Sequence, residues 1–138
     1  PRARMLVNGA SDLLAAVFAI AALLLDVDGA GYLLICAWMA MSMLGMPALS
    51  AVTQDVVDPA SKAFSYGIGI FLSYLLGGAW GPVAVGVMSD ALGGGAEGLR
   101  VALIIVCHAG FAAAMINWLG SRAYPADMEK VAGAQVTA

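Results

Sequence analysis

The hydrophobic positions of this chain fall into long, almost uncharged segments separated by short polar stretches. One of them, residues 63–89, holds 27 residues without a charge between Lys62 and Asp90. As a helix rising about 1.5 Å per residue it would be about 40 Å long, which exceeds the roughly 30 Å hydrocarbon core of a bilayer. Similar segments cover about residues 5–25, 30–54 and 100–121. The pattern predicts an all-α integral membrane protein with four transmembrane helices in residues 1–122.

The composition supports this prediction and excludes other classes. Of 138 residues, 62% are hydrophobic and only 11% are charged, whereas a soluble domain has about 25% charged residues. The mean hydropathy is +0.92, so the chain could not cover itself with polar surface. The net charge of −3 indicates no nucleic-acid partner.

The polar stretches contain most of the charges and predict the orientation. With four crossings, the start of the chain, the connector at residues 55–62 and the tail at residues 123–138 share one side. Most basic residues are on that side: Arg2, Arg4, Lys62, Arg122 and Lys130. The other side has one basic residue and several acids: Arg100, Asp26, Asp28, Asp90 and Glu97. By the positive-inside rule both termini are expected in the cytoplasm, with a bacterial inner membrane as the expected location. The polar tail is expected to be disordered.

Small residues recur at every fourth position along residues 63–89, and a row of this kind lets another helix approach closely. Pro82 lacks an N–H donor and clashes with the preceding turn, so a bend is expected near residues 77–82. The segment is therefore interpreted as a helix that packs tightly in its first half and bends in its second, which makes it a candidate moving part. The residues assigned to packing and gating are Gly69, Ser73, Gly77, Gly78, Gly81 and Pro82.

Methionines, aromatic residues and hydroxyl groups are the candidates for lining a cavity. In the second segment, Trp38 and Ser42 share one helical face, and methionines surround it. Flexible thioethers adapt to varied ligand shapes, so one hypothesis is a cavity for an amphipathic substrate. Ordinary packing between membrane helices explains the same pattern. The candidate substrate-binding residues are Trp38, Met39, Ser42, Met46, Tyr66 and Tyr74.

Two ionisable residues lie inside the apolar segments, and each has two interpretations. Asp12 could take part in proton coupling, as an acid within a membrane often does, or it could belong to a hydrogen-bonded network with Asn8. His108 could also be proton-linked, or it could be a neutral imidazole bonded to a neighbouring carbonyl.

Enzyme chemistry has no visible machinery in this sequence. Gly93, Gly95 and Gly98 match G-x-G-x-x-G, but no predicted strand precedes them, so dinucleotide binding is not indicated. One histidine and two scattered cysteines do not form a usual zinc site. We expect no catalytic residues, no metal and no cofactor.

Two stretches resemble a known family. The run Thr53–Pro59 between two apolar segments, followed by Gly77–Leu92, is similar to the tenth-to-eleventh helix region of the major facilitator superfamily. The G-P-x-x-x-G-x-x-S-D pattern at residues 81–90 resembles spinster-like members in particular, and Pro1–Arg4 resembles the basic loop before the ninth helix. Asp58-Pro59 departs from the two prolines of many spinster-like chains.

The resemblance implies that the four segments are helices nine to twelve of a twelve-helix major facilitator fold. The tenth helix then lines the central cavity and the eleventh acts as a gate. The implied function is proton-linked secondary transport by alternating access, with an amphipathic substrate of lysophospholipid or sphingosine-phosphate type, or another organic substrate. The chain would be a C-terminal fragment, with the lipid bilayer and the missing N-terminal helices as its partners.

Two other hypotheses stay open from the sequence. A self-contained four-helix dimeric small multidrug exporter would use an essential acid in its first helix, which is where Asp12 lies. A non-transporting membrane scaffold subunit would use the surface around Gly77 and Gly81 to hold a partner.

Overall fold

The computed structural model describes residues 2–25 and 29–136, and its regular elements are all helical. In chain order these are α1 (Arg2–Leu24), α2 (Gly29–Asp55), η1 (Pro59–Ser61), α3 (Lys62–Ser73), η2 (Tyr74–Ala79), α4 (Trp80–Ala91), α5 (Gly95–Cys107) and α6 (Ala109–Val136). Four helical spans within these residues are long and apolar enough to cross a membrane. The all-α prediction with four such spans is confirmed. Asp26 and Asp28, which were assigned to the less basic side, lie outside the described residues.

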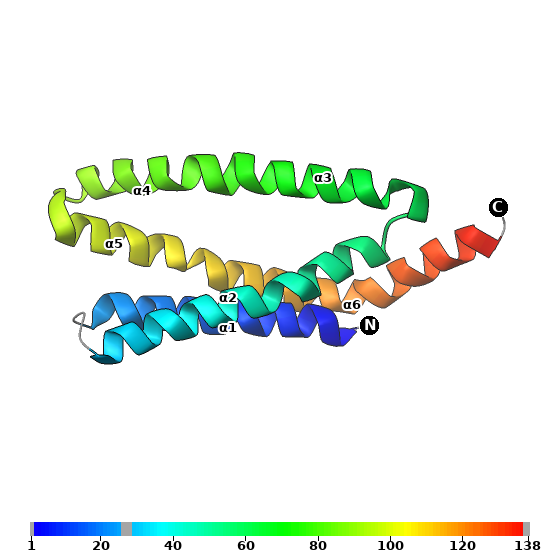
Figure 1. Cartoon of the computed structure of the whole chain (residues 1–138), viewed down its shortest axis with the longest axis horizontal. Helices are drawn as coiled ribbons and strands as arrows, with labels where there is room; N and C mark the ends of the chain where they lie inside the picture. Colours follow the sequence, from blue (N-terminus) through cyan, green and yellow to red (C-terminus); the bar gives the residue numbers. More distant parts are fainter. Residues whose placement is uncertain (1, 26–28, 137–138) are drawn as a thin grey trace.

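Helix α1 lies at the centre of the packed part of the molecule. It runs antiparallel to α2, and α6 packs along it (Figure 1). Its inward face has small side chains, and Ala15, Ala16 and Ala19 are all buried. Small residues suit this position because, within lipid, helices associate mainly through close backbone approach.

Two close contacts between α1 and its neighbouring helices involve Gly110 and Gly45. A Cβ at Gly110 on α6 would lie 2.7 Å from the Cβ of Ala16 on α1. A Cβ at Gly45 on α2 would lie 2.8 Å from Oδ1 of Asn8 on α1. By contrast, a Cβ at Gly69, Gly77 or Gly81 would meet nothing within 4 Å. Among the described residues, no helix therefore approaches closely at these three glycines of the third span.

The third span forms an arm along one side of the molecule. Elements α3, η2 and α4 follow one another as a single long helix, and α5 packs back against α4 (Figure 1). Close to residues 77–82, where a bend was expected, the helix contains the π-helical segment η2, which ends at Ala79. Pro82 cannot donate to the carbonyl one turn before it, at Gly78, and a π turn is one way in which a helix accommodates such a defect.

The fourth span differs from the expected helix at residues 100–121 in two ways. It is interrupted at His108, which lies in a turn between α5 and α6. It also continues to Val136, where the sequence analysis expected a disordered tail after residue 122. The extension is anchored by Tyr124, which is only 3% exposed, so part of the polar tail has a packing partner that local sequence does not show.

The start of α1, the end of α6 and the α2–α3 connector lie at the same end of the molecule (Figure 1). This arrangement agrees with four crossings and brings the basic residues at the start of α1, at the start of α3 and in α6 to one end. The orientation of that end relative to a membrane stays a prediction.

Candidate functional site

A groove between the second half of α2 and α3 is the strongest candidate site. Its volume is about 580 Å³, which lies within the range of roughly 300–1,000 Å³ for ligand pockets. Five residues predicted for substrate binding, packing or gating meet there: Met46, Tyr66, Gly69, Ser73 and Tyr74. The other lining residues are Leu49, Ser50, Thr53, Ser65, Ile68 and Ile70.

Helical spacing explains why these side chains share one groove. On α2, Leu49 and Ser50 follow Met46 by three and four positions, and Thr53 follows them by four and three, so the four residues lie on one helix face. Ser73 donates a hydrogen bond to the carbonyl of Gly69 over 2.8 Å, and Thr53 donates to the carbonyl of Ser50 over 3.0 Å. Because the two hydroxyl protons are used within their own helices, Ser73 and Thr53 offer oxygen acceptors to a ligand.

The groove has an apolar body with a few neutral polar groups. Its tyrosines are well exposed, with Tyr66 at 48% and Tyr74 at 73%, so both rings are accessible. Tyr74 is also the first residue of the π-helical segment η2. A displacement of η2 would therefore move a side chain of the groove.

The remaining predicted binding residues lie elsewhere. Trp38 lines a separate cavity between α1, α2, α5 and α6. The hydroxyl of Ser42 donates to the carbonyl of Trp38 over 2.9 Å, and Met39 is 59% exposed on α2. The predicted gate residues Gly77, Gly78, Gly81 and Pro82 follow the groove on η2 and α4.

Asp12 belongs to a polar cluster between α1 and α6. Its Oδ2 accepts a hydrogen bond from Nδ2 of Asn117 over 3.1 Å and a longer one from Nδ2 of Asn8 over 3.4 Å. The expected network between Asp12 and Asn8 is therefore present. Asn117 was not predicted, because its approach to Asp12 depends on the packing of α6 against α1.

His108 contacts its own helix and a neighbouring ring. Its Nδ1 lies 2.7 Å from the carbonyl oxygen of Ile104, and its ring meets Phe111 edge-on with centroids 5.6 Å apart. This arrangement favours the interpretation of a histidine bonded to a neighbouring carbonyl over the proton-linked one.

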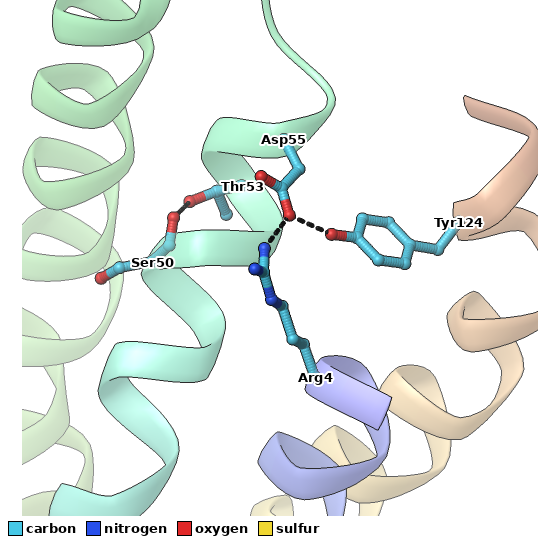
Figure 2. A network of polar contacts seen from close by, with 5 residues as sticks. All are labelled: Arg4, Ser50, Thr53, Asp55 and Tyr124. Carbon is cyan, nitrogen blue, oxygen red and sulfur yellow. Dashed lines mark hydrogen bonds and ion pairs between the residues drawn. The ribbon is translucent and has the colours of Figure 1, made fainter. Parts of the chain in front are cut away.

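A second polar network joins three helices at the end where the chain begins. Figure 2 shows the side chains of Arg4 from α1 and Tyr124 from α6 pointing toward the carboxylate of Asp55 at the end of α2. Oδ2 of Asp55 accepts from the Arg4 guanidinium and, over 2.5 Å, from the Tyr124 hydroxyl. This network was not predicted, because residue 124 was expected to lie in a disordered tail. The sequence did contain one signal for it: Arg4 and Asp55 have opposite charges and stand at the ends of two apolar segments that were predicted to share one side.

The Asp55 network lies beside the groove. Figure 2 shows Ser50 and Thr53, which line the groove, on the last turns of α2 before Asp55. The contacts at Asp55 therefore hold the end of α2 that forms one groove wall.

Comparison with protein-family models, curated proteins and solved structures found no match for this chain. Within residues 2–25 and 29–136, no group of three or more His, Cys, Asp or Glu side chains is placed to hold a metal ion. The relation to the major facilitator superfamily stays a prediction from the residues quoted above.

Proposed function

We propose that this chain forms part of a membrane transporter that moves an amphipathic, lipid-like or organic molecule along the groove between α2 and α3. The observation that supports this most is the groove itself. It lies between two spans long and apolar enough to cross a membrane, and it combines about 580 Å³ of space with hydroxyl-bearing side chains. A transported amphipathic molecule needs a binding site between membrane-crossing helices, whereas a water-soluble ligand does not.

The chemistry of the groove suits a ligand with a long apolar part. Met46 adapts its shape to different chains, and tyrosine rings present an apolar face together with a polar hydroxyl. None of the lining residues has a formal charge. The groove would therefore hold the apolar body and neutral polar groups of a substrate, and a charged head group would need a partner outside it.

Alternating access needs one group of helices to move against another, and the arm of α3, η2 and α4 is our candidate for the moving part. Its side chains are exposed over most of its length, so few contacts oppose movement. A π-helical segment such as η2 often marks a functional position in a helix. In this proposal, a change at η2 moves Tyr74 and opens or closes the groove.

Proton coupling has no group within the groove, because no carboxyl or imidazole side chain lines it. The proton-linked part of the hypothesis therefore rests on Asp12 and His108, which both lie outside. Of the two, Asp12 is the better candidate, since it is a carboxyl group inside a membrane span with partners on two helices.

A photolabelling experiment tests the groove. The chain in lipid nanodiscs is exposed to a lysophosphatidylcholine with a diazirine in its acyl chain, and labelled peptides are identified by mass spectrometry. Labelling at residues 46–53 and 65–74 is expected to be competed by excess unlabelled lysophospholipid. Gly69→Trp fills the groove and should reduce that labelling at least about fivefold, the equivalent of roughly 1 kcal/mol of binding.

Gly86→Trp is the matched control, because Gly86 on α4 does not line the groove. A Cβ at either glycine meets nothing within 4 Å, so both variants should fold. Equal labelling in the two variants would count against the proposal. So would labelling spread evenly over every apolar helix face, which is the pattern expected of a scaffold subunit.

A further inference from the structure

A second, smaller cavity has a charged residue in its wall and is not part of the groove. Its volume is about 200 Å³, and it lies where α1, α2, α5 and α6 meet. Most of its wall is apolar: Ala15, Ala16, Ala19, Trp38, Val106, Cys107 and Gly110. Asp12 is the only lining residue with a formal charge.

The carboxylate of Asp12 is held in place but has no cationic partner in this cavity. Asn117 and Asn8 donate to the same oxygen, Oδ2, which fixes the orientation of the carboxyl group. Neither lysine nor arginine is among the residues of the wall. A carboxylate in a low-dielectric site is costly without a counter-charge, so a cationic ligand would supply what the wall lacks.

The wall indicates which kind of cation fits. A hard metal ion takes about six or more oxygen ligands, and only one carboxylate lines this cavity. An organic ammonium group has no such requirement, because its methyl or methylene groups pack against apolar side chains. Trp38 adds an indole ring, the aromatic surface that binds ammonium groups best.

We propose that this cavity binds a small organic cation, such as a quaternary or protonated amine. Asp12 is the counter-ion, and the indole of Trp38 contacts the cation. The cavity is below the size typical of drug-like ligands, so the ligand is of the size of tetramethylammonium or a little larger. The proposal does not depend on the function proposed for the groove.

The first test measures binding of tetramethylammonium to the full chain in dodecyl maltoside, an uncharged detergent, by saturation-transfer NMR. The wild-type chain should bind tetramethylammonium in preference to tert-butanol, its neutral analogue in shape. Asp12→Asn, which keeps the side-chain volume, should weaken binding at least about tenfold. Trp38→Leu should weaken it about 3- to 30-fold.

Trp80→Leu is the control for the tryptophan variant, because Trp80 is 60% exposed on α4 and does not line this cavity. It should bind as the wild type does. The proposal is overturned if Asp12→Asn or Trp38→Leu binds as well as the wild type. It is also overturned if tert-butanol binds equally, or if sodium displaces tetramethylammonium at equal concentration.

A second measurement needs no change at Asp12 and keeps the proposal testable if that variant does not fold. Cys107 lines the cavity, so a bound cation should shield its thiol. In a Cys36→Ser background, tetramethylammonium should slow the reaction of Cys107 with methyl methanethiosulfonate several-fold, and tert-butanol should not. Unchanged rates at saturating tetramethylammonium would contradict the proposal.

Discussion

A Gly110→Leu variant is expected to unfold roughly 10 °C below the wild-type chain, because a leucine there has no room between α6 and α1. A Cβ at this position would lie 2.7 Å from the Cβ of Ala16 and 3.3 Å from the backbone oxygen of Asp12. The oxygen belongs to the α1 backbone and cannot rotate away, so the helices must separate. Overpacking of this kind costs about 1–3 kcal/mol, and a clash with backbone places it at the upper end.

Gly81→Leu is the matched control for this prediction. It makes the same replacement inside a helix and gains the same intrinsic helix propensity, up to about 1 kcal/mol. A Cβ at Gly81 meets nothing within 4 Å, so its thermal midpoint in dodecyl maltoside should match or slightly exceed that of the wild type. Equal midpoints for the two variants would show that α1 and α6 do not pack as described.

The Asp55→Ala variant should lose the anchored end of α6 while α1 and α2 stay paired. The substitution leaves the Tyr124 hydroxyl, which is buried, without its acceptor. A buried polar group that loses its partner costs about 1–3 kcal/mol. Hydrogen exchange of backbone amides in residues 121–130 should therefore become about tenfold faster or more, whereas exchange in the middle of α1 should change little.

Three further variants separate the hydrogen bond from the charge. Asp55→Asn keeps an acceptor for Tyr124 and should exchange more slowly than Asp55→Ala. Arg4→Gln should have a small effect, because the Arg4 side chain is 53% exposed and exposed ion pairs contribute little. In a Tyr124→Phe background, Asp55→Ala should increase the exchange rate much less than it does in the wild-type chain. The reason is that the two groups are in direct contact, so removing either one already breaks the hydrogen bond. Additive effects would contradict the network in Figure 2.

The candidate site was predictable in part. Met46, Tyr66, Gly69, Ser73 and Tyr74 were singled out from residue type and helical spacing, and the structure places them in one groove. Trp38 was assigned to the same wall but lines the other cavity. Spacing along α2 gives the angle between side chains, but it does not say which neighbouring helix each face meets.

The sequence by itself determined that four segments are long and apolar enough to cross a membrane, and that Pro82 removes a backbone donor from the third of them. Both follow from local chemistry: uncharged runs of this length are stable in a bilayer, and proline removes a donor wherever it stands. Only the tertiary structure decided which glycines face another helix, which partner Asp12 has on α6, and why the helix continues past residue 122. These features depend on contacts between residues far apart in the chain, such as Asp55 and Tyr124. Such contacts arise when helices pack, and the pattern along a single helix does not record them.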